Sequence, residues 1–217
     1  IQPPPRSRTP RPARAAPDRE SPMPQTWFTA DTHFGHANVL SFCGRPFPGI
    51  AEHDAALVRG WNARVAPGDD VWHLGDFALR LDPVALARVF ARLHGRKHLI
   101  VGNHDHKATL RLPWSSPPRQ LHAISVAGRR VVLCHYALRS WHRIHAGAVH
   151  LYGHTHGTIP GTRHAEDVGV DAWGYAPVSL AEALARMAGN ALLEDELRLA
   201  AAGRDHPGAD ADADGRS

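Results

Sequence analysis

The sequence predicts a single domain of mixed α/β fold, and three observations support this. The chain has 217 residues, of which 43% are hydrophobic and six are tryptophan, enough for the packed core of one domain and short for two. Between residues 25 and 200, short apolar runs alternate with longer amphipathic ones, which is typical of strands alternating with helices. Polar residues recur directly after the short runs, where α/β proteins hold their ligands.

Seven short runs predict strands, because they are rich in β-branched and aromatic residues. In chain order they span 26–30 (TWFTA), 70–74 (DVWHL), 97–101 (KHLIV), 122–126 (HAISV), 129–134 (RRVVLC), 148–152 (AVHLY) and 167–171 (DVGVD). Apolar residues at helical spacing predict helices over 51–65, 83–93 and 179–188. The second helix opens on Asp82 and Pro83, and the third opens on Ser179 with Glu182 three residues later, a capping box.

The two ends of the chain differ in composition from the middle. Residues 1–24 are rich in Pro and Arg, and residues 201–217 are acidic and of low complexity, so both are predicted to be disordered. The first segment lacks the apolar region of a secretory signal, and no run approaches the ~20 apolar residues that span a bilayer, so no membrane partner is expected. Cys43 and Cys134 lie too far apart for a zinc knuckle, and a reducing cytoplasm fits best.

The formal charge of +4 arises unevenly, from a basic start and an acidic tail around a nearly balanced middle. It therefore does not indicate a nucleic-acid-binding face, although nucleic acid is not excluded as a partner. Arg129 and Arg130 are interpreted as solvated surface residues. The unusual feature of the composition is its 17 histidines, because histidine serves metal sites and proton transfer.

Five blocks of metal-binding residue types follow five predicted strands. They are Asp31-x-His33, Gly75-Asp76, Gly102-Asn103-His104-Asp105, His135 and Gly153-His154-x-His156. A glycine stands before the polar residues in three of them, where it permits a sharp turn and close approach of a neighbouring segment. Because strand ends gather at one edge in α/β folds, the blocks are expected to converge on one metal-rich site.

Carboxylate, amide and imidazole ligands suit two divalent cations, and a single carboxylate can bridge a pair of metals about 3.5–4 Å apart. Such a pair lowers the pKa of a shared water towards about 7 and neutralises phosphoryl oxygens, so the hydroxide can attack phosphorus.

These blocks, in this order and spacing, resemble the calcineurin-like metallophosphoesterases. The wider pattern from "DTHFGHANVL" to "DVGVDAWGYAPVSL" is similar to a compact prokaryotic and phage subgroup of that superfamily, and the resemblance covers roughly residues 26–180. It implies that 25–200 form the catalytic domain. The implied fold is a four-layer α-β-β-α sandwich, with two mixed β-sheets flanked by helices. Asp167 stands where the subgroup tends to have asparagine, a change that spares every implied ligand.

The resemblance also implies the roles of the site residues. One metal would be held by Asp31, His33, Asp76 and His156, and the other by Asp76, Asn103, His135 and His154. His104 would donate a proton to the leaving oxygen, with Asp105 orienting its imidazole. The family hydrolyses phosphate esters by direct attack of a metal-bound hydroxide, without a covalent enzyme intermediate. Mn²⁺ is the first expectation for both metals, with Fe, Zn²⁺ or Ni²⁺ as alternatives.

The substrate is less defined by the sequence. His36, Arg45, Arg139 and Arg163 are candidates for phosphate contact, because guanidinium and imidazole groups bind phosphoryl oxygens. Trp141, in the segment before the His154 block, suits either packing or a nucleotide base. A phosphodiester is slightly favoured over a phosphomonoester, and a nucleotide or cyclic phosphate fits an open site. The oligomeric state is not indicated.

Two other functions agree less well with the sequence than a phosphoesterase does. A catalytically silent scaffold of the same fold would be free to lose His104 or a ligand, and none is missing. A metallo-β-lactamase-type hydrolase requires a His-x-His-x-Asp-His motif, which the sequence lacks.

Overall fold

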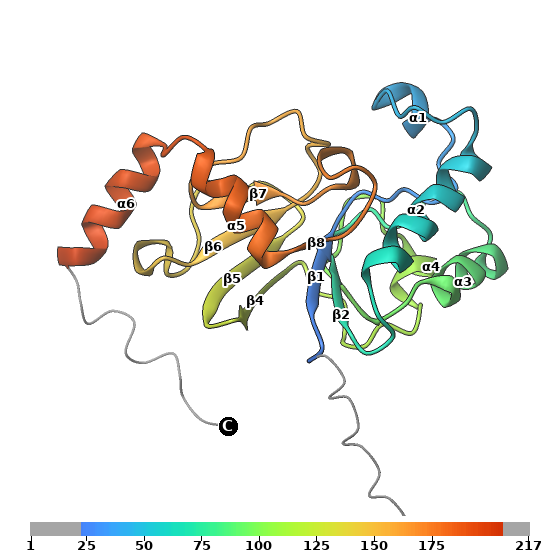
Figure 1. Ribbon diagram of the computed structural model, residues 1–217, viewed down its shortest axis with the longest axis horizontal. Coiled ribbons are helices and arrows are strands. Elements are labelled where there is room, and N and C mark those ends of the chain that lie inside the picture. Colours follow the sequence, from blue (N-terminus) through green and yellow to red (C-terminus); the bar gives the residue numbers. More distant parts are fainter. Residues whose placement is uncertain (1–22, 206–217) are drawn as a thin grey trace, which may run out of the picture.

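Two four-stranded β-sheets pack face to face (Figure 1), in a computed structural model that describes residues 23–205. The first sheet has the order β3-β2-β1-β8, with β1 Thr26–Thr29, β2 Asp70–His73, β3 Arg96–Leu99 and β8 Val178–Ser179. The second has the order β4-β5-β6-β7, with β4 Leu121–Val126, β5 Arg129–Cys134, β6 Val149–Tyr152 and β7 Ala165–Asp167. Each sheet is parallel except for one antiparallel edge strand, β8 or β4. Both sheets are therefore mixed, as predicted.

Helices flank the two sheets. They are α1 Val39–Phe42, α2 Ile50–Arg64, α3 Pro83–Arg92, α4 Lys107–Leu110, α5 Leu180–Gly189 and α6 Glu194–Asp205, with 3₁₀ turns η1 Ile144–Ala146 and η2 Val170–Ala172. Helix α5 packs its buried side chains into the core between the sheets. In Figure 1, α2, α3 and α4 lie beyond the first sheet, and α6 lies beyond the second. Within the described residues, no helix combines the length and apolar character needed to cross a bilayer.

Three hydrophobic clusters account for the layers. Between the sheets, Phe28 and Leu74 of the first pack with Leu133 of the second. On the outer face of the first sheet, Trp27 and Val71 pack in a cluster with residues of α2 and α3. On the outer face of the second sheet, a cluster around Val132 and Tyr152 includes Trp141 and Ile144, of which Ile144 lies in η1. Helix α6 lies against η1. The predicted four-layer α-β-β-α sandwich is confirmed.

Most predicted elements are found within about two residues of their expected bounds, but one strand is wrong. The segment 167–171 reads as an alternating strand, whereas β7 ends at Asp167 and η2 begins at Val170. The chain turns there because Val170 donates its backbone N–H to the carbonyl of Ala30, after Ala30 and Gly169 pair as a bridge between the two sheets. The elements α1, α4, α6 and β8 were not predicted.

Both predicted helix starts are confirmed. The Asp82 carboxylate accepts the backbone N–H groups of Val84 and Ala85, and Ser179 and Glu182 form the reciprocal capping box. Of the segments predicted to be disordered, 1–22 and 206–217 lie outside the described residues. Helix α6 continues to Asp205, past the expected end of the domain at residue 200.

Candidate metal centre

The predicted ligands converge at the carboxyl ends of the central strands of both sheets. The chain leaves β1 at Asp31 and His33, β2 at Asp76, β5 at His135, and β6 at His154 and His156. These residues form two groups, in each of which one donor atom per residue lies within 4.8 Å of the others. The groups are Asp31, His33 and His156, and Asp76, His135 and His154. Each group is part of one implied ligand set, without Asp76 in the first and without Asn103 in the second.

Asp76 lies between the two groups. Its Oδ2 is 3.6 Å from His33 Nε2 and 3.6 Å from His135 Nε2. One carboxylate oxygen thus faces an imidazole of each group, which is the position required of a bridging ligand.

Two buried donor atoms in the first group have no hydrogen-bond partner within the described chain, namely Asp31 Oδ1 and His33 Nε2. Burial raises the pKa of Asp31 well above its ordinary value, and the nearby carboxylates of Asp167 and Asp76 raise it further. Burial also lowers the pKa of His33 to about 2, so its imidazole is neutral and able to bind a metal. Since unpaired buried polar atoms are costly, a divalent cation fits this donor set and would satisfy both atoms.

Hydrogen bonds fix which imidazole nitrogen is left to bind a cation. His135 Nδ1 donates to the carbonyl oxygen of Leu74 at 2.7 Å, and Nε2 lies 3.0 Å from Asn103 Oδ1. His156 Nδ1 lies 2.7 Å from the Asp171 carboxylate, to which it donates. In both residues Nε2 would be the nitrogen that binds a cation, as is usual when a carbonyl or carboxylate holds the other nitrogen.

Five of the predicted ligands adopt left-handed backbone conformations. Within the described chain, nine residues other than glycine have this conformation. Five of the nine are Asp31, His33, Asp76, His154 and His156, whose φ angles lie between 49° and 67°. An L-residue in this region is strained by about 1–2 kcal/mol, and such strain concentrates at functional sites. The backbone is thus bent to aim these side chains at one point.

Glycine at the strand ends permits the close approach. A Cβ at Gly75, which has φ 95°, would lie 2.5 Å from His135 Nδ1 and 2.7 Å from the Gly102 backbone. A Cβ at Gly102 would overlap the Asp76 side chain. Any side chain at these two positions would therefore push β2, β3 and the His135 block apart.

The structure corrects the expected role of Asp105. Its buried carboxylate accepts three backbone N–H groups, those of Asp76, Phe77 and Gly102, each at 2.9 Å. Among the described residues, it has no hydrogen bond to the His104 imidazole. Asp105 therefore holds the ends of β2 and β3 together and does not orient His104.

The structure also corrects the expected role of Arg45. Its buried guanidinium forms a two-pronged ion pair with Asp171, at 2.8 and 2.7 Å, and donates to the backbone carbonyls of Asp31 and Thr32. It is committed to the scaffold and is not free to bind phosphate. Through Asp171 it holds His156, a predicted ligand. The sequence does not reveal this link, because Arg45 and Asp171 are 126 positions apart.

Of the remaining phosphate candidates, only His36 lies at the centre. His36 is buried, with its ring centroid 5.3 Å from that of His33 and 6.2 Å from that of His104. Arg139 is bound to Asp195 of α6, and Arg163 donates to the carbonyl of Asn190. Neither arginine is brought to the metal ligands by any contact within residues 23–205.

Arg80 lies near His36 and is not among the residues predicted for the site. Burial lowers the pKa of His36, and the neighbouring charges of His104 and Arg80 lower it further. Arg80 is exposed, has φ 65°, and has no hydrogen-bond or ion-pair partner within the described residues. Its only sequence signal is its place just beyond the Gly75-Asp76 block.

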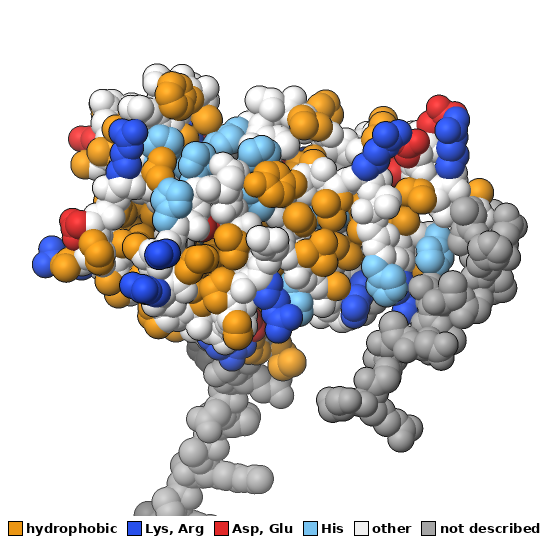
Figure 2. Space-filling model, turned by 180° about the vertical axis from the view of Figure 1, so that it is seen from behind, with side chains coloured by type: hydrophobic (Ala, Val, Ile, Leu, Met, Phe, Trp, Pro, Cys, Tyr) orange, Lys and Arg blue, Asp and Glu red, His pale blue; other side chains and the backbone are white. Residues whose placement is uncertain are grey.

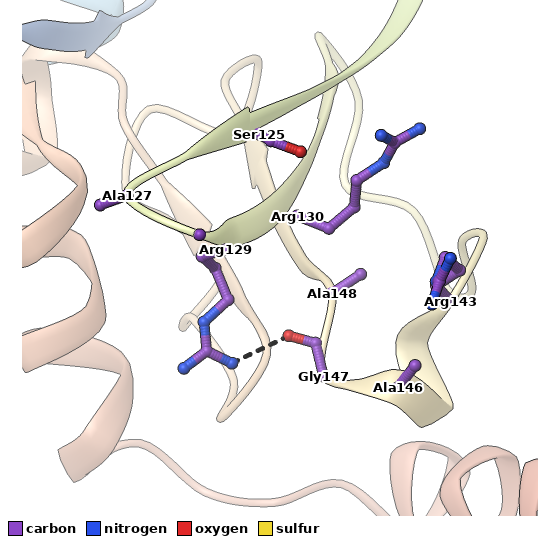
Figure 3. Close-up of a pocket in the computed structure, with 9 residues that line it drawn as sticks. Ser125, Ala127, Arg129, Arg130, Arg143, Ala146, Gly147 and Ala148 are labelled. Atoms are coloured by element: carbon purple, nitrogen blue, oxygen red, sulfur yellow. Dashed lines mark hydrogen bonds between the residues drawn. The ribbon is translucent and has the colours of Figure 1, made fainter. Parts of the chain in front are cut away.

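The surface around the centre is open. Figure 2 shows histidine side chains gathered on one face, with hydrophobic side chains beside them. A separate hollow of about 440 Å³ is lined by Arg129, Arg130 and Arg143 (Figure 3), where Arg129 donates to the carbonyl of Gly147. This hollow lies at the start of β5, whereas His135 follows the other end of that strand. The hollow is therefore not part of the candidate metal centre.

Comparison with known proteins finds relatives in archaea and phages. The chain is 30% identical over 166 residues to an uncharacterized protein of Methanocaldococcus jannaschii, MJ1445, covering 73% of this chain and 88% of that protein. It is 30% identical over 193 residues to the gene 66 protein of Mycobacterium phage L5, covering 70% and 89%. No family model matches the sequence.

Among solved structures, a protein of unknown function from Aquifex aeolicus, AQ665, superimposes with a TM-score of 0.59 at 23% identity, covering 72% of this chain and 96% of that one. This match shows a shared fold. The five motif blocks meet at one edge of the two-sheet sandwich. At 30% identity over most of its length, the chain belongs to one family with MJ1445 and the gene 66 protein of phage L5.

Proposed function

We propose that the protein is a binuclear metal-dependent phosphoesterase. The observation that supports this best is the position of Asp76 Oδ2, 3.6 Å from an imidazole nitrogen of each ligand group. The first cation would be held by Asp31, His33, Asp76 and His156, and the second by Asp76, Asn103, His135 and His154. When bound, such a pair activates water at neutral pH and neutralises phosphoryl oxygens.

His104 is proposed as the general acid. Its backbone N–H donates to Asp76 Oδ1 at 2.8 Å, and its ring centroid is 5.5 Å from that of His33. The side chain is half-buried, so it reaches both the ligand cluster and the solvent. As water adds to phosphorus and the P–O ester bond breaks, the imidazolium of His104 gives its proton to the leaving oxygen.

His36 and Arg80 are proposed to bind the phosphoryl oxygens. His36 lies near His104 and Arg80 lies near His36, and the guanidinium of Arg80 has no competing partner in the described chain. Mn²⁺ is the first choice of metal, and Fe, Zn²⁺ and Ni²⁺ suit the same donors. A phosphodiester remains the favoured substrate, with a nucleotide or cyclic phosphate as alternatives.

The test is hydrolysis by the metal-loaded protein. With Mn²⁺ added, we expect release of p-nitrophenol from bis(p-nitrophenyl) phosphate or p-nitrophenyl phosphate, and loss of that release in Asp76→Ala. A protein that binds two metals and hydrolyses neither ester would instead be the silent scaffold.

A further inference from the structure

Two clefts adjoin the metal centre at different ligands. The first, of about 510 Å³, is lined by Phe42, Cys43, His154, Thr155, His156, Thr158 and Ile159. The second, of about 390 Å³, is lined by Val101, Gly102, Asn103, Gln120, Leu121, Cys134 and Tyr136. They share no lining residue, and each is large enough for a small organic group.

The boundary between the clefts is formed by an aromatic side chain and a ligand. The Tyr136 ring centroid is 4.9 Å from that of His154 and 5.0 Å from that of His135. Tyr136 lines the second cleft, and His154 lines the first. A phosphorus atom bound at the ligands would therefore have one cleft on the Phe42 side and another on the Tyr136 side.

Each cleft presents exposed apolar surface beside the ligands. Phe42 is 76% exposed on α1, with its ring centroid 6.5 Å from that of His36, and Ile159 is 52% exposed. Tyr136 is 46% exposed. An exposed aromatic ring next to a binding site is a stacking surface for a planar group, since every nucleobase or aryl ring offers a π-face.

Charge limits what the clefts can hold. Among the described residues, neither lining includes a Lys, Arg, Asp or Glu. Beyond the proposed metal ions, a second phosphate or a carboxylate of the substrate would meet no Lys or Arg side chain in either lining. This lining therefore favours uncharged substituents and disfavours a polymer with a charge at every link.

On the proposed function, we infer that the substrate is a phosphodiester joining two uncharged organic groups, at least one of them planar. Phe42 and Ile159 bind one group, and Tyr136 with Leu121 binds the other. A phosphomonoester would leave one cleft empty. Phe42 and Tyr136 are thus specificity-determining residues of the same site.

Comparing the affinities for two diesters that carry the same single charge separates the contribution of the clefts from that of the charged phosphate. In calorimetric titrations of the Mn²⁺-loaded protein, diphenyl phosphate should bind at least about tenfold more tightly than dimethyl phosphate. Phe42→Ala and Tyr136→Ala should each reduce the affinity for diphenyl phosphate several-fold, with little effect on dimethyl phosphate. Tyr136→Phe, which keeps the ring, should restore binding. Val84→Ala, at a side chain 60% exposed on α3, is the matched control for losing exposed apolar surface.

Equal affinity for the two diesters would overturn the inference, as would unchanged binding in both alanine variants. These outcomes are separable from failure of the proposed function. If the protein bound diphenyl phosphate tightly through Phe42 but hydrolysed no ester, the proposed enzymatic activity would be wrong and the proposed binding clefts would be supported. If the protein hydrolysed monoesters but bound both diesters equally well, the enzymatic activity would be supported and the proposed binding clefts would be wrong.

Discussion

The backbone of His104 is held in place, and its imidazole is proposed to serve the substrate. The N–H of His104 donates to Asp76 Oδ1, which fixes the proposed acid next to the proposed bridging ligand. Replacing His104 with alanine should keep this bond and leave metal content unchanged, while turnover falls about 100-fold or more for esters with poor leaving groups. For p-nitrophenol, which leaves without a proton, the fall should be smaller. Equal losses for both kinds of ester would contradict the acid role.

Asp105 differs from His104 although the two are adjacent. Alanine at position 105 would strand three buried N–H groups, at about 1–3 kcal/mol each, so the free energy of unfolding should fall by at least about 3 kcal/mol. Thermal denaturation measures this, and His104→Ala, in the same loop, is the control that should remain near wild type. If Asp105→Ala kept wild-type stability and lost only turnover, the orienting role would be right after all.

For single residues, the sequence predicts which side chains meet better than it predicts what holds them. The Asp, His and Asn of the five blocks could be predicted to lie together because each block follows a strand, and strand ends meet at one edge. The role of Arg45 could not, because its partner Asp171 is distant in the chain and only the fold brings them together. Asp105 was misjudged because adjacency to His104 is a weaker constraint than three nearby backbone donors.

His150, on β6, anchors the loop that follows β5. Its ring accepts the N–H of Leu138 at Nε2 and donates from Nδ1 to the carbonyl of Val132. Burial lowers its pKa to about 4. The unfolded chain takes up this proton near pH 6.5, so stability should decline as pH falls from about 6.5 to 4, by about 3 kcal/mol from this group. NMR titration of the His150 ring checks this, and protonation near pH 6.5 would refute it.

The capping box at α5 offers an independent test of an element. Ser179→Ala removes the acceptor for the Glu182 backbone N–H, and the free energy of unfolding should fall by about 1 kcal/mol. Chemical denaturation measures the change, and Ser41→Ala, an exposed serine on α1, is the control. A cost equal to that of the control would show that the cap is not stabilising.

Elements with strong local signals were the ones predicted. Helix α3 combines Asp82, Pro83 and a regular apolar stripe, and β5 ends in four consecutive buried apolar residues. Helices α1 and α4 have only four residues each, too few to show a period. Helix α6 was missed because it is held by a distant contact, in which Thr162 donates to the Glu196 carboxylate.

The whole molecule positions the centre where the two sheets meet. Ala30 and Gly169 pair across the sheets, and His154 donates its N–H to Asp31 Oδ2 at 2.9 Å, joining the blocks after β1 and β6. The sandwich could be expected only through the family resemblance, because periodicity distinguishes strands from helices but does not assign strands to sheets. Both ligand groups draw on strands of both sheets, so the metal site and the fold depend on each other.

The central claim is a two-metal centre bridged by Asp76, and metal content tests it most directly. After loading with Mn²⁺ and removal of free metal, the wild-type chain should retain two ions, measured by elemental analysis. Asp76→Ala should lose both, or keep one weakly, because the shared ligand is gone, while His104→Ala should retain two. Two ions retained by Asp76→Ala, or none by the wild type, would contradict the account.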